Sequence, residues 1–364
     1  GCKFFVAYPM TPSSSLMHFM AEHGQKNGVV VKHAEDEISV INMAIGASYA
    51  GVRSMLGTAG GGFSLMVEGL GLAGITETPL VLMVGQRPGP ATGMPTWTSQ
   101  GDLHFVINAS QDEFPRIVLA PGDVEEAFYL TFEAFNLADY YQTPVFILTD
   151  KYIGESHESV NLFKLENLTV NRGKLLSFEE GEKQEGYLRY KITDDGIQTR
   201  ALPGMKKTVF TANSYEHDEY GWSTESATER INQVMRRNKK LEIYKKTIPE
   251  QKIYGDPEAD LTLIAWGSTK GPVLQALQDP REENYQRRVN FLHLTHVWPL
   301  PVLQIEGVLK KAQKTLIIEG NSTAQMASLI RQETGINIEN RLLRFDGRPF
   351  YPEDIITKVK EILS

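Results

Sequence analysis

Cysteine is nearly absent from this sequence of 364 residues, since Cys2 is its single example. One cysteine cannot form a disulfide within the chain. It also cannot hold an iron–sulfur cluster, because such clusters usually need about four thiolates. Sparse cysteine is typical of proteins of the reducing cytoplasm, and we therefore expect a cytoplasmic location.

Long hydrophobic runs and an excess of basic residues are missing as well. No apolar stretch reaches the roughly 18 residues that a membrane-spanning helix needs, and no signal peptide is expected. Lys and Arg number 37 against 45 Asp and Glu, which gives a net charge of -8 at pH 7. This balance argues against a nucleic-acid partner.

Short apolar runs alternate with amphipathic stretches in the N-terminal part of the chain. The runs that predict strands are residues 4–7, 29–31, 54–57, 80–84, 116–119 and 145–148. The stretches that predict helices are residues 14–23, 36–50, 63–76 and 124–141. This alternation predicts a doubly wound α/β domain over residues 1–160, in which the β-branched run 29–31 forms a buried strand.

The periodicity weakens over residues 161–251, which we interpret as an irregular connector that wraps the domains. Within it, basic and amide side chains dominate residues 230–246 and predict a solvated helix. A second α/β pattern follows, with strands expected at residues 261–266, 289–294 and 315–319. The sequence therefore predicts a further α/β domain over residues 252–364.

Three acidic residues, Glu35, Asp36 and Glu37, stand where the helix of residues 36–50 should begin. Carboxylates in a first turn interact favourably with the positive end of the helix dipole. One of them could instead face a cleft at the carboxyl end of the preceding strand, where open α/β sheets bind ligands. Both interpretations remain open on the pattern alone.

Bare backbone precedes the next helix, at Gly60, Gly61 and Gly62. The glycines could make a tight turn, or they could let a flat ligand approach main-chain N–H groups at a helix start. The run is not a Walker phosphate loop, because the Lys-Ser/Thr ending is missing.

Several motifs together resemble the α subunit of 2-oxoacid:ferredoxin oxidoreductases, which are thiamine-diphosphate enzymes. These motifs are YPMTPSS at residues 8–14, AEDE at 34–37, TAGGGF at 58–63, GPATGMPT at 89–96, WGSTKG at 266–271 and EGN at 319–321. The resemblance implies a pyrimidine-type thiamine-diphosphate domain followed by a transketolase C-terminal-like domain. The latter is expected to serve packing and assembly, or else the path of coenzyme A.

The activity implied by the resemblance is oxidative decarboxylation of a 2-oxoacid with coenzyme A. The substrate would be 2-oxoglutarate, pyruvate or a branched-chain 2-oxoacid, and the products acyl-CoA, CO₂ and reduced ferredoxin. A non-catalytic assembly or regulatory subunit is the alternative. A transketolase-like or dehydrogenase component fits less well, because residues 8–14 and 85–102 differ from those proteins.

In the family a glutamate hydrogen-bonds a ring nitrogen of the cofactor's aminopyrimidine, which requires a dry pocket. In thiamine enzymes this glutamate is followed by a glycine nine positions later. The residue nine positions after Glu37 is Gly46, whereas the residue nine positions after Glu35 is Ala44. Glu37 is therefore expected to be the catalytic acid, and Glu35 a helix-start acid. The other expected cofactor contacts are Tyr8, Pro9, Thr58, Gly61, Gly62 and Phe63.

The resemblance gives Thr11 a role in binding the substrate, but the loop of residues 85–102 departs from the family pattern. Trp97 stands where the family commonly has an arginine that grips the 2-oxoacid carboxylate. An indole has one donor and no charge. Trp97 could shape a hydrophobic pocket while Arg87 or the partner subunit supplies the cation, or the chain could serve another substrate class.

The Gly-Asp-Gly motif with a downstream Asn, which holds Mg²⁺ and the diphosphate in these enzymes, is not found. In the family that half of the site belongs to the β subunit. No metal ligands are therefore expected on this chain, and Mg²⁺ and a 4Fe–4S cluster are expected on the β subunit. Ferredoxin would be the acceptor, and a γ domain could precede residue 1 or be separate.

Overall fold

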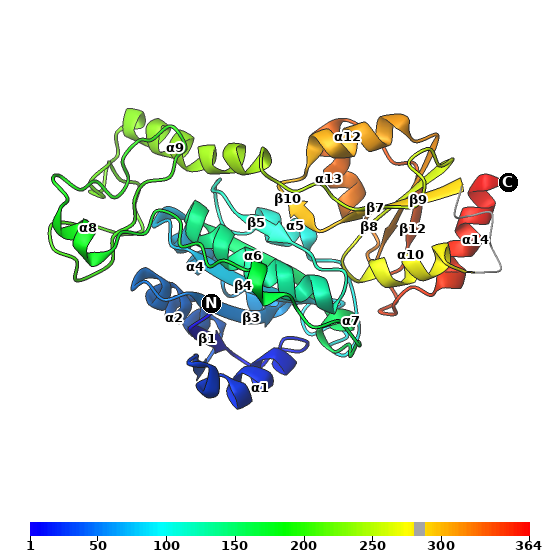
Figure 1. Cartoon of the computed structure of the whole chain (residues 1–364), viewed down its shortest axis with the longest axis horizontal. Helices are drawn as coiled ribbons and strands as arrows, with labels where there is room; N and C mark the ends of the chain where they lie inside the picture. The colour runs from blue at the N-terminus through cyan, green and yellow to red at the C-terminus, as the bar shows by residue number, and fades with distance from the viewer. Residues whose placement is uncertain (280–287) are drawn as a thin grey trace.

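The computed structural model describes residues 1–279 and 288–364, which form two α/β units side by side (Figure 1). The N-terminal unit contains a seven-stranded sheet in the order β10-β5-β6-β4-β3-β1-β2. Its parallel strands are β1 (Phe4–Ala7), β2 (Val30–His33), β3 (Ser54–Ala59), β4 (Leu80–Gln86), β5 (Ile117–Leu119) and β6 (Pro144–Asp150). The doubly wound α/β fold expected from the sequence is confirmed.

Helices cover both faces of this sheet because successive residues of each strand point to opposite sides. Phe5, for example, belongs to one core cluster and Val6 to another. The helices are α1 (Ser14–His23), α2 (Glu37–Tyr49), α3 (Gly60–Phe63), α4 (Val67–Ile75), α5 (Leu103–Asn108), α6 (Val124–Tyr141) and α7 (Lys151–Gly154). The core clusters place α2, α4 and α5 on one face and α1 and α6 on the other.

The C-terminal unit is built on a five-stranded sheet in the order β12-β11-β8-β9-β7. Its strands are β7 (Ile253–Tyr254), β8 (Leu261–Trp266), β9 (Val289–Leu294), β11 (Lys314–Glu319) and β12 (Asn340–Leu343). Its helices are α10 (Lys270–Leu277), α12 (Val302–Lys311), α13 (Gln325–Thr334) and α14 (Pro352–Leu363). From β8, the chain adds β9 on one side and later β11 on the other, so the strand order reverses beside β8.

The two units share structure across the expected domain boundary. Strand β10 (His296–Trp298) follows β9 in sequence but pairs antiparallel with β5 of the first sheet. One hydrophobic cluster also continues from α4 and α5 to the helices α12 and α13. The divisions at residues 160 and 251 remain predictions, and the two units are held together by a common core.

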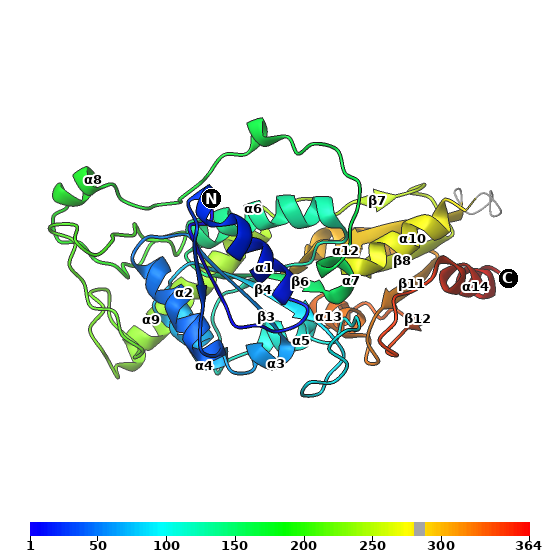
Figure 2. The same cartoon turned by 90° about the horizontal axis from the view of Figure 1, so that it is seen from below.

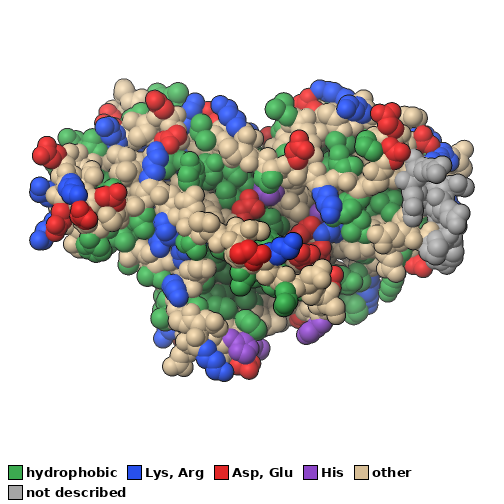
Figure 3. All heavy atoms as spheres, viewed as in Figure 1, with side chains coloured by type: hydrophobic (Ala, Val, Ile, Leu, Met, Phe, Trp, Pro, Cys, Tyr) green, Lys and Arg blue, Asp and Glu red, His purple; other side chains and the backbone are tan. Residues whose placement is uncertain are grey.

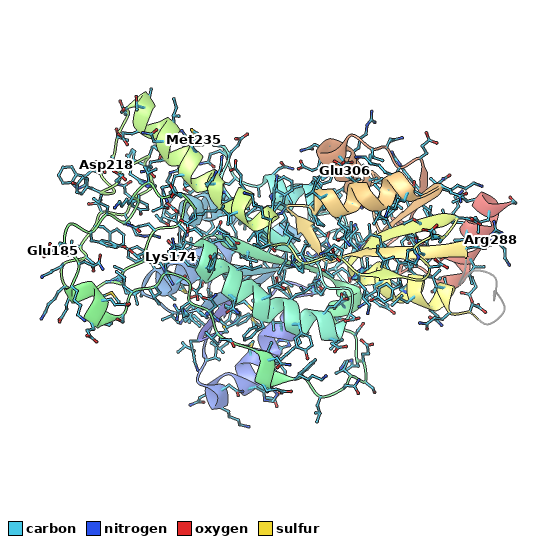
Figure 4. The ribbon with its side chains drawn as sticks, turned by 45° about the horizontal axis from the view of Figure 1, so that its top comes forward. Lys174, Glu185, Asp218, Met235, Arg288 and Glu306 are labelled. Atoms are coloured by element: carbon cyan, nitrogen blue, oxygen red, sulfur yellow. The ribbon has the colours of Figure 1, made fainter. Side chains whose placement is uncertain are left out.

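The connector packs along the N-terminal unit, at the end of the molecule away from α14 (Figures 1 and 2). Figure 4 shows Lys174, Glu185 and Asp218 in its loops, far from Arg288 of the C-terminal unit. It contains the short helix α8 (Phe178–Glu182) and the long helix α9 (Ala227–Lys245). Within residues 1–279 and 288–364, none of the helices combines the length and apolar character of a membrane span.

Two local predictions are wrong. The run at residues 29–31 was expected in a buried strand, but β2 is the edge of the sheet and Val30 is 63% exposed. The helix at residues 230–246 was expected to be solvated, yet α9 buries Gln233, Arg236 and Lys240. Arg236 and Lys240 pair with Glu77, whose carboxylate compensates their charge.

Hydrophobic side chains gather in a hollow between α1 and α6 (Figure 3). The hollow is an open pocket of about 640 Å³ whose lining includes Phe19, Met20, Phe128 and Phe132. None of the site residues expected from the sequence lines it. The candidate site is therefore elsewhere, at the ends of the strands.

Candidate functional site

The residues that the sequence singles out follow four neighbouring parallel strands. β4, β3, β1 and β2 lie next to one another in the sheet. Because the strands are parallel, their carboxyl ends meet at one edge, where open α/β sheets bind ligands. Thr11 follows β1, Glu37 follows β2, the glycine run follows β3 and Arg87 follows β4.

The three acids at the start of α2 have three different environments. Asp36 is the N-cap, and its carboxylate accepts a hydrogen bond from the Ser39 N–H at 2.7 Å, which lowers the pKa of Asp36. Glu35 is exposed. Glu37, the first residue of the helix, is only 4% exposed. Capping thus accounts for one acid, and burial separates Glu37 from the other two.

The Glu37 carboxylate lies directly against the glycine run. A Cβ placed on Gly62 would be 2.7 Å from Glu37 Oε1 and would also collide with the Thr58 hydroxyl. Gly62 is therefore required for these two side chains to approach the backbone. Among the described residues, no group donates a hydrogen bond to the Glu37 carboxylate. A buried carboxylate usually has a partner, so this one is suited to binding a donor from a ligand.

Arg87 reaches from the end of β4 to the loop after β1. Its guanidinium donates a hydrogen bond to the Thr11 carbonyl oxygen at 2.6 Å. Burial lowers the pKa of Arg87, and the nearby Asp102 carboxylate opposes that shift. No carboxylate of the described residues lies within ion-pair distance of Arg87, so its charge remains able to attract an anion.

Asp102 belongs to the same site but was not among the residues expected there. A Cβ placed on Gly60 would be 2.6 Å from Asp102 Oδ2. Burial raises the pKa of Asp102 to about 6, although Arg87 acts in the opposite direction. Asp102 is the single acidic residue of the loop 85–102. An isolated acid in a loop at the strand ends could have marked it as a candidate site residue from the sequence.

Trp97 lies in the same loop, before Asp102 and beside the C-terminal unit. The indole is 37% exposed, and the Arg348 guanidinium carbon lies 3.4 Å from the centre of the indole ring. A cation from a distant part of the sequence therefore stacks on the side chain that stands at the usual arginine position. Arg87 lies instead beside Thr11, and Trp97 is not among its hydrogen-bonding partners.

The remaining expected cofactor contacts differ in position. Tyr8 and Pro9 are exposed just after β1, and the Tyr8 ring lies 6.2 Å from that of His33. Gly61 faces the loop after β4, because its Cβ position is 3.7 Å from the Ala91 carbonyl oxygen. The Phe63 ring is fully buried among aromatic neighbours in the core. It therefore contributes packing rather than a surface for a ligand.

A family model described as "Pyruvate flavodoxin/ferredoxin oxidoreductase, thiamine diP-bdg" matches residues 1–236. The chain belongs to this family. It is 39% identical over 372 residues to "2-oxoacid:ferredoxin oxidoreductase 1, subunit alpha" of Sulfurisphaera tokodaii, covering 98% of this chain and 58% of that one. It is 31% identical over 360 residues to "2-oxoglutarate synthase subunit KorA" of Methanothermobacter thermautotrophicus, covering 99% of this chain and 93% of that one.

A solved structure of a related oxidoreductase has the same fold. A 2-oxoglutarate:ferredoxin oxidoreductase from Magnetococcus marinus, with 2-oxoglutarate, coenzyme A and succinyl-CoA bound, matches with a TM-score of 0.94 at 35% identity. The match covers 100% of this chain and 62% of that chain. A split-gene transketolase, at a TM-score of 0.52 and 11% identity, shares the fold alone. The family resemblance seen in the sequence is confirmed.

The chain spans less than two thirds of the length of several relatives, at 58% of the Sulfurisphaera chain and 62% of the Magnetococcus chain. In residues 1–279 and 288–364, no group of three or more His, Cys, Asp or Glu side chains could hold a metal ion.

Proposed function

We propose that this chain is the α part of a 2-oxoacid:ferredoxin oxidoreductase and contributes the pyrimidine-binding half of a thiamine-diphosphate site. The observation that supports this most is Glu37, a buried carboxylate without a hydrogen-bond donor among the described residues, held against the bare backbone of Gly62. A flat aromatic ring fits beside this carboxylate at the exposed Gly61, where a Cβ would come no closer to another atom than 3.7 Å and the missing side chain leaves room above the backbone.

The donor set fits the aminopyrimidine of thiamine diphosphate. Glu37 would hold a proton at a ring nitrogen, Gly62 would let that carboxylate lie close to the backbone, and the bare backbone at Gly61 would receive the face of the ring. When bound, thiamine diphosphate supplies the carbanion chemistry that decarboxylates 2-oxoacids, while the protein orients it.

The substrate would bind beside this half-site through its carboxylate. Arg87 is the cation that the structure holds next to Thr11, and a guanidinium matches a carboxylate with two parallel hydrogen bonds. The Thr11 hydroxyl is the second candidate contact. The substrate class is a 2-oxoacid, and the 2-oxoglutarate named for two relatives makes that compound the first to test.

The proposal includes a β subunit that supplies Mg²⁺, the diphosphate contacts and a 4Fe–4S cluster, and ferredoxin as the electron acceptor. This chain has one cysteine and cannot carry the cluster alone. Coenzyme A would be the co-substrate, and the cytoplasm the expected location.

The deciding experiment compares Glu37→Gln with Glu35→Gln in the complex purified with its β partner. Electron transfer to a dye is measured with 2-oxoglutarate, pyruvate and branched-chain 2-oxoacids, and bound thiamine diphosphate is quantified separately. Glu37→Gln should lower kcat by roughly 10²- to 10⁴-fold, the usual contribution of a positioned acid or base. The exposed Glu35 serves as the matched control and should leave kcat unchanged.

Full activity in Glu37→Gln, together with unchanged cofactor content, would contradict the proposed role. It would favour the alternative of a non-catalytic assembly subunit. A wild-type complex that binds thiamine diphosphate but turns over none of the 2-oxoacids would instead point to another substrate class.

A further inference from the structure

The loop between β4 and α5, residues 87–102, leaves the candidate site at Arg87, contacts the C-terminal unit through residues 98–101 and returns to the site at Asp102 (Figure 2). Gln100 makes the central contact and is only 2% exposed. Its Nε2 donates to the Trp266 carbonyl oxygen at 2.7 Å, and its Oε1 accepts from the Gly320 N–H at 2.7 Å. One side-chain amide therefore bridges two segments of the other unit.

These two segments lie at the point of the second sheet where the strand order reverses. Trp266 ends β8 and Gly320 follows β11, and these are adjacent parallel strands where the strand order reverses. The crevice outside the carboxyl ends of strands at such a point is where open α/β sheets bind ligands. Here the Gln100 side chain occupies it. A Cβ on Gly267, which has a φ of 58°, would lie 2.9 Å from Gln100 Nε2.

The receiving side of the crevice is held rigidly by a buried carboxylate. Glu319 accepts hydrogen bonds from the backbone of Met326 and Ala327 and from the Asn321 side chain. Asn321 in turn donates to the Gln100 carbonyl oxygen at 3.1 Å. The position of Gln100 is therefore determined by α13 and β11, which belong to the core of the C-terminal unit.

Neighbouring residues of the loop attach to the same unit through their backbones. The N–H groups of Thr98 and Gln100 donate to the carbonyl oxygens of Gly347 and Gly320, at 3.1 and 2.8 Å. The Gly101 carbonyl oxygen accepts from the Gln325 side chain at 2.7 Å. Asp102, which reaches the candidate site, follows directly after this anchored stretch.

We infer that Gln100 is a positioning residue, through which the C-terminal unit holds the 87–102 loop so that Asp102 lies against Gly60 and Arg87 lies beside Thr11. The inference rests on the proposed function for its effect on the substrate. It gives the C-terminal unit a part in the reaction beyond packing and assembly, because the crevice at its strand ends holds the substrate loop of the other unit.

The first test is amide hydrogen exchange in residues 88–99 of the full chain in its complex, for wild type, Gln100→Ala and Gln332→Ala. Gln332 is exposed on α13 and serves as the matched control. Loss of two buried hydrogen bonds should speed exchange in the loop roughly tenfold or more. Exchange at wild-type rates in Gln100→Ala would overturn the inference.

The variant Gln100→Glu distinguishes loss of the loop's anchoring hydrogen bonds from general damage to the core. A protonated glutamic acid has the shape of glutamine and can donate to the Trp266 carbonyl oxygen, whereas the ionised form cannot. After correction for intrinsic exchange rates, loop protection in Gln100→Glu should exceed that in Gln100→Ala and increase as the pH falls. If the loop amides exchange equally fast in Gln100→Glu and Gln100→Ala across pH 5 to 8, the role assigned to the Gln100 side-chain amide is contradicted.

Kinetics connect the loop to the substrate. Gln100→Ala should raise KM for the 2-oxoacid several-fold while bound thiamine diphosphate stays constant, because Glu37 and Gly62 lie outside the loop. The exchange measurement does not depend on turnover. A loosened loop in a complex without 2-oxoacid activity would refute the proposed function alone, and an unchanged loop in an active complex would refute the positioning role alone.

Discussion

Two buried glutamates of the N-terminal unit have opposite surroundings. Glu77, at 2% exposure, binds Arg236 and Lys240 of α9 through its two carboxylate oxygens, and we call these three residues the closed cluster. Glu37 is similarly buried but has no such partner among the described residues, and with Arg87 and Asp102 it forms what we call the open site. A buried charge that the fold compensates serves the fold, whereas one left without a partner is suited to a ligand.

The electrostatics of the closed cluster follow from its geometry. Burial alone would raise the pKa of Glu77, but Arg236 and Lys240 outweigh it and hold that pKa well below its usual value. Burial lowers the pKa of Lys240 to about 8, although Glu77 opposes that shift. The cluster therefore attaches α9 to the N-terminal unit.

The largest expected effect is on stability, and it separates the two glutamates. Glu77→Gln leaves two buried cations without their counter-charge and should lower the free energy of unfolding by about 3–5 kcal/mol. Glu37→Gln should change it little, because no partner loses its charge. Urea unfolding of the two variants measures the difference, and equal losses would remove the distinction between the closed cluster and the open site.

The stabilisation that Glu77 contributes should decrease at low pH. Because the folded-state pKa of Glu77 is depressed, its contribution is complete above the unfolded value of about 4.3 and is lost as the pH falls below it. Wild type should therefore lose more stability than Glu77→Gln on acidification below that value.

A smaller effect is expected at the open site, in substrate affinity. Arg87→Ala should raise KM for the 2-oxoacid by roughly 10- to 100-fold, since hydrogen bonds to charged groups contribute about 1.5–3 kcal/mol. Arg348→Ala is the comparison, because Arg348 stacks on Trp97 rather than beside Thr11. KM is measured for both variants in the same complex. A greater rise of KM in Arg348→Ala than in Arg87→Ala would show that the C-terminal unit, rather than Arg87, binds the substrate carboxylate.

The smallest predicted effect concerns Asp102, whose pKa is raised to about 6 by burial. As the pH rises through 6, ionised Asp102 should partly neutralise Arg87 and raise KM for the 2-oxoacid a few-fold, about 0.5–1 kcal/mol. Asp102→Asn should flatten this dependence between pH 5 and 7. An unchanged pH profile of KM in Asp102→Asn would show that another group titrates.

Asp102 also affects stability with the opposite sign to Glu77. Its folded-state pKa lies above the unfolded value of about 3.9, so the fold favours the protonated form. The stabilisation is complete below that value and declines as the pH rises towards 6. The closed cluster and the open site are therefore expected to respond to pH in opposite directions.

The sequence by itself determined the elements and the loops that carry the candidate site. The predicted bounds of β8, β9, α1 and α6 agree with the structure, because periodicity and capping residues act over neighbouring positions. Glu37 could be singled out because parallel strands bring their ends to one edge and the spacing to Gly46 resembles the family pattern.

Tertiary structure decided what depends on residues far apart in the chain. The buried face of α9 depends on Glu77, more than 150 positions earlier, and the crevice that holds Gln100 is built by segments more than 160 positions later. β10 joins the first sheet for the same reason, because its partner β5 lies in the other unit. Local sequence specifies propensity and polarity, but a charge or an amide can be buried only where a distant partner satisfies it.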